Sequence, residues 1–266
     1  MENGGIKMSL QGKKVLVVGT GKSGIAATEL LRANNIDTVL FDGNKELDTE
    51  ALYEKVPAIR EVPLILGDMT DAQMDEFDVA VLSPGVPTDI PMVNSLRDKG
   101  VKIWGEIELA YTFGAGRIIA ITGTNGKTTT TALTGEIMKN YFKDVRVVGN
   151  IGIPYTSMVT GSTDETVTVA EISSFQLETI DTFKPHISAI LNITPDHLNR
   201  HHTMENYIRA KEDITKNQTK DDFCILNYED KVLRGFAAEC PAKVVFFSSK
   251  SELSEGFYLN GDIIMY

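Results

Sequence analysis

The chain of 266 residues lacks the features that mark several large classes of protein. It has only two cysteines, Cys224 and Cys240, without the spacing of a disulfide framework or metal site, so we expect reduced thiols. Its longest apolar runs, such as Val15–Val18 and Ile118–Ile121, have the length of strands, and Met1–Gln11 contains no apolar signal segment. We therefore expect a cytoplasmic protein that does not enter a membrane.

Positive charge is also scarce. The 26 lysines and arginines face 37 acidic residues, which gives a formal net charge of −11. A chain with this balance has no general basic surface for nucleic acid or anionic lipid, so we expect neither as a partner. A positive field that binds a polyphosphate must then be local, inside a cleft.

Short apolar runs alternate with amphipathic stretches along the chain, a pattern that predicts α/β architecture with parallel sheets covered on both faces. The strands expected in a first, Rossmann-like domain are Lys14–Val18, Thr38–Phe41, Leu64–Leu66, Val79–Leu82 and Lys102–Trp104. Those expected in a second domain are Arg117–Ile121, Val145–Val148, Thr166–Ala170, Ile187–Ile193, Phe223–Leu226 and Val244–Phe247. The segment Glu106–Gly116 is predicted to be a helix that ends in a Gly-Ala-Gly hinge, and we predict domains at 1–113 and 114–266.

The last ten residues, Phe257–Tyr266, predict a β-hairpin whose turn is Asn260-Gly261. The outer strand ends on apolar and aromatic residues, and such a strand normally pairs with further chain. We therefore expect more protein after Tyr266, and we expect these 266 residues alone to be inactive.

The strongest functional signal is a phosphate-binding loop at Gly123–Thr128, between the strand that starts at Arg117 and a predicted helix. Its glycines allow backbone N–H groups to face phosphate oxygens, and the helix N-terminus adds positive potential. Lys127 would contact the β- and γ-phosphates of ATP, and the Thr128 hydroxyl would bind Mg²⁺. The spacing differs from the general P-loop, because Ile121 stands where the first glycine should be.

A second glycine-rich loop, Gly19-Thr-Gly-Lys-Ser-Gly24, follows the first expected strand. It fits the dinucleotide fingerprint, and Asp42 lies where a ribose-binding acid would stand. The pattern alone is compatible with NAD, with another phosphate-bearing ligand, or with a merely structural turn.

Three segments resemble the Mur ligases, which build peptidoglycan precursors. Gly123–Thr128 resembles the ATP loop of that family, while Glu171–Glu178 and Leu191–Leu198 resemble its central-domain motifs. The form Ser-Ser-Phe-Gln-Leu-Glu, with Ser83–Val86 and Gly105–Ala110 upstream, is most similar to the D-glutamate-adding branch. The resemblance covers essentially the whole chain. It implies an N-terminal UDP-substrate domain and most of a P-loop ATPase domain, without the family's C-terminal ligase domain.

The activity that this resemblance implies is ATP-dependent amide formation in peptidoglycan biosynthesis, and so in cell-wall biogenesis, cell shape and cell division. Its substrates would be UDP-N-acetylmuramoyl-L-alanine and D-glutamate, and its cofactors ATP and Mg²⁺. A carboxylate acylates poorly, so ATP must first convert it to an acyl phosphate. Catalysis of that step requires mainly positioning and charge neutralisation. We expect a monomer.

The resemblance also assigns roles to single residues. Lys127, His197 and Lys211 would be catalytic, with Lys211 carbamylated. Thr128, Glu171, His197 and carbamylated Lys211 would hold Mg²⁺ ions. The residues expected to bind ATP are Gly123, Thr124, Asn125, Gly126, Lys127, Thr128 and Thr129. Those expected to bind the UDP substrate are Gly19, Thr20, Gly21, Lys22, Ser23, Gly24, Asp42, Ser83, Pro84, Gly85 and Asn150.

One position departs from the family pattern, since Asn199 replaces an aspartate, which removes a charge but keeps an oxygen acceptor. His186, His201 and His202 receive no functional role.

Three alternatives stay open on the sequence. An NAD-dependent oxidoreductase built on Gly19–Gly24 would leave Lys127 and Glu171 without a use. A non-catalytic phosphate-loop switch would need a partner surface, and none is visible. A sister ligase that adds another amino acid, or a folylpolyglutamate-type ligase, would share the ATP loop.

Overall fold

The computed structural model describes residues 9–150 and 152–266, so residues 1–8 of the polar segment Met1–Gln11 and Ile151 lie outside it. The chain forms two compact units. Unit 1 contains the chain up to Gly114 together with Pro154–Gly161 and Glu178–Thr182, and unit 2 contains Ala115–Ile153, Ser162–Leu177 and Phe183–Tyr266. Two short late segments therefore belong to the first unit.

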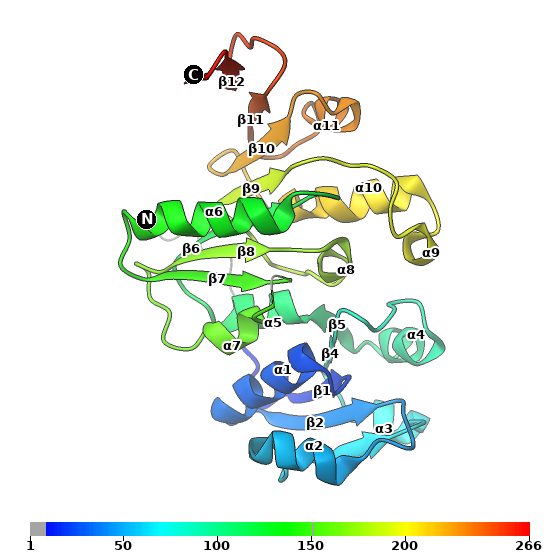
Figure 1. The fold of residues 1–266 in the computed structure, drawn as a ribbon. Helices are drawn as coiled ribbons and strands as arrows, with labels where there is room; N and C mark the ends of the chain where they lie inside the picture. The colour runs from blue at the N-terminus through cyan, green and yellow to red at the C-terminus, as the bar shows by residue number, and fades with distance from the viewer. Residues whose placement is uncertain (1–8, 151) are drawn as a thin grey trace. The chain divides into compact units, whose positions relative to one another are not determined.

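Unit 1 is built on a parallel sheet with the strand order β3-β2-β1-β4-β5 (Figure 1). Its strands are β1 (Lys14–Val18), β2 (Asp37–Asp42), β3 (Leu64–Leu66), β4 (Val79–Leu82) and β5 (Lys102–Gly105). Its helices are α1 (Lys22–Ala33), α2 (Thr49–Lys55), η1 (Pro57–Ile59), α3 (Asp71–Met74), α4 (Pro91–Asp98), α5 (Glu106–Phe113) and α7 (Tyr155–Met158). The predicted parallel sheet is confirmed.

The apolar strands of unit 1 explain why both faces of the sheet are covered. Leu16 and Val18 of β1 lie in one buried cluster with Val93 and Leu96 of α4. Val17, between them, points to the other face because side chains alternate along a strand, and α1 packs against β1. Each such fully buried side chain contributes about 1.5–3 kcal/mol relative to exposure.

Two buried glutamates of α5 bind the late segments into unit 1. Glu106 Oε1 accepts hydrogen bonds from the Thr156 N–H at 2.6 Å and the Thr156 hydroxyl at 2.9 Å, where α7 begins. Glu108, fully buried, accepts from Asp181 N at 2.9 Å, from Thr182 N at 2.8 Å and from Thr182 Oγ1 at 2.6 Å. The motif around Gly105–Ala110 is thus a structural bracket between distant parts of the sequence.

Unit 2 is built on a larger sheet with the order β13-β12-β11-β10-β9-β6-β8-β7, parallel except for the last hairpin. Its strands are β6 (Arg117–Thr122), β7 (Val145–Gly149), β8 (Val167–Glu171), β9 (Ile187–Ile190), β10 (Phe223–Asn227), β11 (Lys243–Ser248), β12 (Phe257–Asn260) and β13 (Ile263–Met265). Its helices are α6 (Lys127–Lys139), α8 (Ser174–Leu177), α9 (Leu198–His201), α10 (Met204–Glu212), η2 (Asp213–Thr215) and α11 (Lys231–Phe236).

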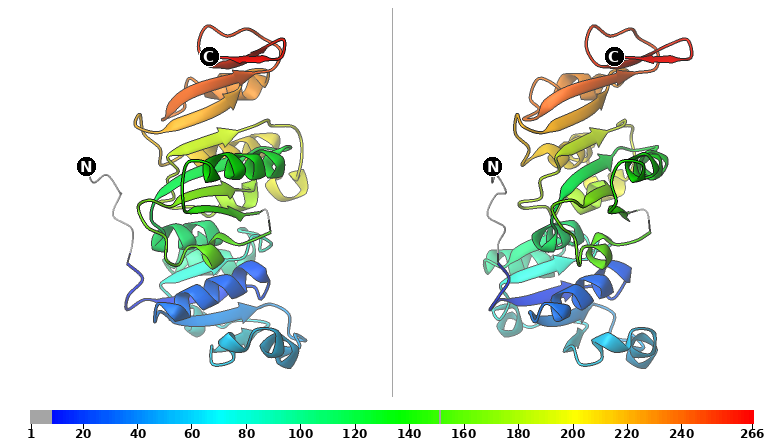
Figure 2. Two further views of the ribbon diagram at one scale, coloured as in Figure 1. Left: turned by 60° about the vertical axis from the view of Figure 1, so that its left-hand side comes forward. Right: turned by 90° about the vertical axis from the view of Figure 1, so that its left-hand side faces the viewer.

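The hairpin predicted at Phe257–Tyr266 is confirmed, and it extends the sheet beyond β11 (Figure 2). Its turn lies one residue later than predicted, at Gly261-Asp262, because Asn260 still pairs with Ile263 and the positive φ falls on Gly261. The strand predicted at Ile187–Ile193 is too long, because β9 ends at Ile190. The strand ends there because Asn192, two residues later, bonds to the phosphate loop and not to a neighbouring strand. Its carbonyl oxygen accepts a hydrogen bond from Thr124 N at 2.9 Å.

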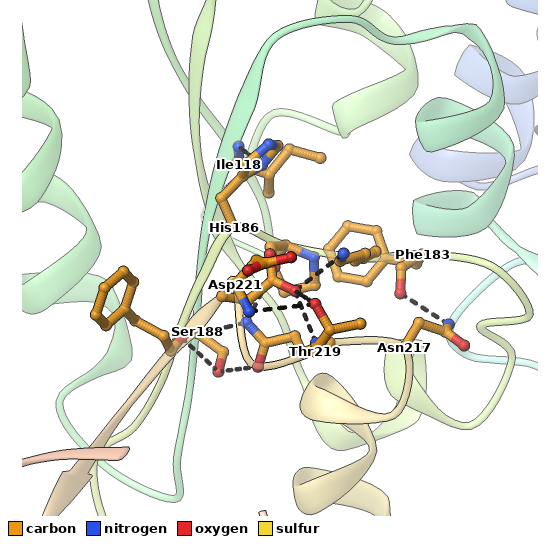
Figure 3. Close-up of polar contacts among 12 residues, drawn as sticks. Ile118, Phe183, His186, Ser188, Asn217, Thr219 and Asp221 are labelled. Atoms are coloured by element: carbon orange, nitrogen blue, oxygen red, sulfur yellow. Dashed lines mark hydrogen bonds and ion pairs between the residues drawn. The ribbon is translucent and has the colours of Figure 1, made fainter. Parts of the chain in front are cut away.

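At the amino ends of β9 and β10, a buried polar network joins these strands to the turn between η2 and β10 (Figure 3). Gln218 accepts from the Ser188 hydroxyl at 2.8 Å and donates to Pro185 O at 2.9 Å. Asp222 accepts from Thr219 N at 2.7 Å and pairs with Lys184 at 3.0 Å. Without these hydrogen bonds, each buried polar group would destabilise the folded state by about 1–3 kcal/mol.

His186 directly precedes β9, and its Nδ1 accepts a hydrogen bond from the Ile118 N–H at 3.3 Å. Burial lowers its pKa, which favours the neutral ring that this acceptor role requires. Cys224 and Cys240 are buried free thiols in unit 2. Across the described ranges, every helix is too short or too polar to cross a membrane.

We predict that Glu108→Ala destabilises unit 1 by about 3 kcal/mol, because the change leaves three partly buried hydrogen-bond donors without their acceptor. Trp104, the single tryptophan, is buried in unit 1 and reports on its unfolding by fluorescence in urea. The matched control is Glu50→Ala, which removes an exposed ion pair with Arg60 and should cost less than about 0.5 kcal/mol. Equal midpoints for the two variants would contradict the bracket role of Glu108.

Candidate active site

The phosphate loop lies between β6 and α6, at the carboxyl edge of the unit 2 sheet, where neighbouring strands β8 and β9 also end. Parallel sheets bind ligands at this edge, at the point where the strand order reverses. Gly126 stands at φ +83° as the N-cap of α6, whose 13 residues run along the face over β6, β7 and β8 (Figure 1). The first-turn amides of this helix have no intrahelical acceptor and so can face an anion.

Two lysines converge on one carbonyl of the loop. Lys127 Nζ donates to Gly123 O and to Thr124 O, both at 2.9 Å, and Lys211 Nζ of α10 donates to Gly123 O at 2.8 Å. Lys211 is only 2% exposed. Burial, assisted by the charge of Lys127, lowers its pKa from 10.5 to about 7. The site thus holds one ammonium and one amine that readily loses its proton.

Tyr207 connects this pair to the loop. Its ring lies beneath Lys211 Nζ, 4.7 Å from the ring centroid, and its hydroxyl is 3.0 Å from Thr124 Oγ1. Thr124 Oγ1 also donates to Thr194 O and accepts from Thr194 N. Because burial raises the pKa of Tyr207, the phenol stays protonated and can donate to Thr124.

Glu171 ends β8 beside the loop strand and is 1% exposed. Its Oε1 accepts from Asn150 Nδ2 at 2.7 Å, while its buried Oε2 has no hydrogen-bond partner among the described residues. A buried carboxylate oxygen without a donor is costly unless a cation or other ligand binds it. Asn150, expected at the substrate, here fixes the orientation of this carboxylate.

His197 lies on the turn before α9 with φ +51°, an unusual backbone conformation for a residue with a side chain. Its ring is half exposed, 5.0 Å from the ring of Phe175, and its Nε2 is 3.4 Å from Asp196 Oδ2. Backbone strain of this kind is concentrated at functional sites. Asn199, the position that departs from the family pattern, is exposed on α9.

Behind His197 lies an aromatic stack. His201 is 4% exposed, its Nε2 lies 2.9 Å from Ser174 Oγ, and its ring stacks on Phe175 at 5.4 Å and contacts Tyr207 at 5.2 Å. Burial and the cations around it lower the pKa of His201 to about 4. The neutral imidazole therefore joins the motif at Glu171–Glu178 to α10, a structural role consistent with the expectation for this histidine.

In unit 1, the Gly19–Gly24 loop follows β1 at the strand-order reversal between β1 and β4. A Cβ on Gly24 would come 1.9 Å from Gly19 O, so the fold itself requires glycine there. Asp42 Oδ2 accepts from Thr20 N at 3.1 Å and from Thr20 Oγ1 at 2.6 Å. Burial opposes ionisation of Asp42, but the bonds from Thr20 and Asn44 outweigh it and lower its pKa.

A cleft of about 690 Å³ opens beside this loop. Of the residues expected to bind UDP, Gly19, Asp42 and Gly85 line it. Ser83, at the end of β4, has a buried hydroxyl without a partner among the described residues. The volume is ordinary for a small-molecule site.

The family assignment rests on two matches. Residues 121–263 match the Mur ligase middle domain, and residues 13–105 match the MurD-like N-terminal domain of Mur ligases. The chain belongs to the Mur ligase family. The second match contains the whole Gly19–Gly24 loop, which therefore belongs to the N-terminal domain of this family.

Named relatives agree with this assignment. This Mur ligase chain is 58% identical over 259 residues to the UDP-N-acetylmuramoylalanine–D-glutamate ligase of Lachnoclostridium phytofermentans. The matched region covers 97% of this chain and 57% of that protein. It is 47% identical over 260 residues to the enzyme of the same name from Clostridioides difficile, with the same coverage. The chain thus spans less than two thirds of the length of the curated relatives it matches.

Solved structures show the same fold at lower identity. A UDP-N-acetylmuramate-alanine ligase from Thermotoga maritima is 24% identical with a TM-score of 0.54, covering 93% of this chain and 54% of that one. A murein peptide ligase from Psychrobacter arcticus is 14% identical with a TM-score of 0.54, covering 92% and 55%.

Within the described ranges of this Mur ligase, no three His, Cys, Asp or Glu side chains are placed to hold a metal ion. The residues that the structure brings together are Lys127, Lys211 and the Gly123 carbonyl, and separately Glu171 and Asn150. Sequence reasoning missed Tyr207 and Asn192. Tyr207 could have been found, because it stands four residues before Lys211 and so on the same face of α10.

We predict that the protein loses stability as pH falls from about 6.5 toward 4, because His201 is neutral when folded but protonates when unfolded. Since its folded pKa lies below the unfolded value, its contribution is complete above pH 6.5 and lost as pH approaches 4. The loss reaches about 3 kcal/mol. His201→Phe keeps the stack but should flatten this part of the pH–stability curve in urea titrations. An unchanged slope in the variant would show that other groups carry it.

Proposed function

We propose that this chain carries the UDP-substrate and ATP-binding parts of a ligase that joins D-glutamate to UDP-N-acetylmuramoyl-L-alanine. The two relatives named above, which are 58% and 47% identical to this chain, bear the name of such a ligase. The observation that carries the proposal is the convergence of Lys127 and Lys211 on the phosphate loop. Unit 2 thereby concentrates cationic groups in a chain whose net charge is −11.

In the proposed reaction, ATP phosphorylates the precursor carboxylate, and the amine of D-glutamate then displaces phosphate from the acyl carbon. Lys127 would leave the carbonyls of Gly123 and Thr124 and contact the β- and γ-phosphates. The first-turn amides of α6 would face the phosphate oxygens. Both contacts neutralise charge that grows during phosphoryl transfer.

Mg²⁺ fits the residues present at one position. Glu171 offers a buried carboxylate oxygen that lacks a partner, and Thr128 is the hydroxyl that follows the loop lysine. Hard oxygen ligands of this type suit Mg²⁺, which when bound neutralises phosphate charge and orients it for transfer. Asn150 would hold Glu171 in place.

A second cation near His197 requires a change at Lys211, since an ammonium repels a metal ion. We propose that Lys211 is carbamylated: its neutral amine attacks CO₂, an N–C bond forms, and a proton leaves to solvent. The lowered pKa of about 7 makes the amine available near neutral pH. The carbamate would then supply an anionic oxygen group where Lys211 now donates to Gly123 O.

Unit 1 would hold the UDP part of the precursor in the cleft beside Gly19, Asp42 and Gly85. The Ser83 hydroxyl offers an unsatisfied polar group at that end of β4. Of the alternatives, a sister ligase with another amino-acid substrate would use the same ATP loop, so substrate assays must separate the two.

We predict that Lys127→Ala lowers the rate of D-glutamate-dependent phosphate release at least about a hundredfold, because a positive contact to the transferred phosphate is lost. The assay uses the complete gene product, ATP, Mg²⁺, UDP-N-acetylmuramoyl-L-alanine and each candidate amino acid in turn. Lys139→Ala, at the exposed far end of the same helix, is the matched control and should keep wild-type activity. Equal activity of the two variants, or a preference for another amino acid, would contradict the proposal.

We also predict a carbamate on Lys211 that is detected by ¹³C NMR after addition of ¹³C-bicarbonate. Its signal should grow as pH rises through about 7, because CO₂ reacts only with the unprotonated amine. Lys211→Met should abolish the signal, while Lys216→Met, a lysine just beyond the same helix, should retain it. A signal that survives in Lys211→Met would exclude this lysine as the carbamylated group.

A further inference from the structure

The phosphate loop of this chain is held from outside by a residue of the neighbouring strand end. Asn192, two residues after β9, uses its side-chain amide to bond both main-chain groups of Asn125. Its Oδ1 accepts from Asn125 N at 2.8 Å, and its Nδ2 donates to Asn125 O at 2.9 Å. Exchange of both bonds with one residue is the pairing that an adjacent strand provides in a sheet. Here a side chain performs it.

The backbone of Asn192 adds a third contact, because its carbonyl accepts from Thr124 N at 2.9 Å. Glycine at position 123 permits this approach: a Cβ there would meet Leu191 Cβ at 3.1 Å and Leu191 N at 3.2 Å. The loop glycine therefore serves close contact with the end of β9, in addition to any contact with phosphate.

These bonds divide the amides of the loop into two groups. The N–H groups of Thr124 and Asn125 are directed to Asn192. The N–H groups of Gly126, Lys127, Thr128 and Thr129 belong to the first turn of α6, where the helix supplies no acceptor. The first group fixes the loop to the sheet, and the second is available to an anion.

This arrangement occurs in a loop of irregular spacing. Ile121 replaces the first glycine of the general P-loop, and only the short stretch Gly123–Gly126 separates β6 from α6. In this short loop, Thr124 and Asn125 are held by hydrogen bonds to Asn192, which follows another strand.

We propose that Asn192 is a positioning residue for ATP, which sets the direction of the α6 N-terminus by clamping Asn125. The inference rests on the proposed function, because it assigns the clamp to nucleotide binding. Thr124 is anchored separately through Thr194 and Tyr207, so loss of the Asn192 side chain releases Asn125 while the rest of the loop stays attached.

The chain offers a matched control in Asn227. This residue ends β10, the strand next to β9, and its Nδ2 donates to Leu191 O at 3.0 Å. Its Oδ1 accepts from Glu229 N at 3.0 Å. It therefore makes two side-chain hydrogen bonds at the same sheet edge, with partners outside the phosphate loop.

The first experiment tests the clamp without nucleotide. Hydrogen–deuterium exchange of the complete gene product is followed in the peptide that contains Thr124 and Asn125. Asn192→Ala should speed exchange in this peptide about fivefold to tenfold, as expected for loss of about one protected hydrogen bond. Asn227→Ala should leave it within twofold of the wild type. Unchanged exchange in Asn192→Ala would overturn the clamp.

The second experiment tests the role in binding. The affinity for Mg-ATP is measured by calorimetry, and the KM values for ATP and for the amino acid by phosphate release. Asn192→Ala should weaken ATP binding and raise the KM for ATP about fivefold to tenfold, with the KM for the amino acid within twofold. Asn227→Ala should change neither.

A second variant keeps the test decisive if Asn192→Ala does not fold. Asn192→Gln retains both amide groups but displaces them by one methylene, so it should show a smaller loss in the same direction. Wild-type ATP affinity in a folded Asn192 variant would refute the positioning role alone. Failure of the wild type to bind Mg-ATP would instead refute the proposed function, and the exchange measurement would still decide whether the clamp exists.

Discussion

The carbonyl oxygen of Gly123 is the point on which the candidate site of unit 2 depends. Two lysines from different helices donate to it, and both are drawn there by one acceptor with two lone pairs. Two ammonium groups at one oxygen repel each other, and burial of Lys211 adds a desolvation cost. The structure relieves this by lowering the pKa of Lys211 to about 7, so the pair can exist with a single charge.

In this arrangement, a bound polyphosphate would give Lys127 a new hydrogen-bond acceptor, and carbamylation would change the group that Lys211 presents to the loop. With anionic oxygens present, Lys127 gains a stronger acceptor than a carbonyl, because charge-assisted hydrogen bonds are about twice as strong as neutral ones. The carbonyls of Gly123 and Thr124 thus hold the lysine close to the site without competing strongly for it. The acidic chain can in this way keep a positive field confined to one loop.

Local sequence predicted most of the regular structure. Apolar, β-branched runs predicted β1, β3 and β4 at their observed bounds, because a strand buried on both faces needs a continuous apolar sequence. The hairpin was predicted from Asn260-Gly261, whose backbone preference is local, although the turn itself is Gly261-Asp262. The over-extension of β9 arose because the apolar residues Leu191 and Ile193 continue the alternation of a strand. The course of this segment is set instead by bonds to residues about 67 positions away in the chain, such as that between Asn192 and Asn125. Such bonds leave no periodic signal.

In the site, too, some features are set by local sequence and others by bonds between distant residues. Lys127 and the loop glycines are visible in sequence, since a strand–glycine–lysine–helix order has one main physical use. No local pattern around Glu106 and Glu108 predicts that both are buried, because their partners, Thr156 and Thr182, come from segments far along the chain. Unit 1 is therefore completed by segments that follow the phosphate loop in sequence. A contiguous division of the chain would separate these carboxylates from the donors that make their burial tolerable, so unit 1 requires chain from beyond Gly114 to satisfy its own core.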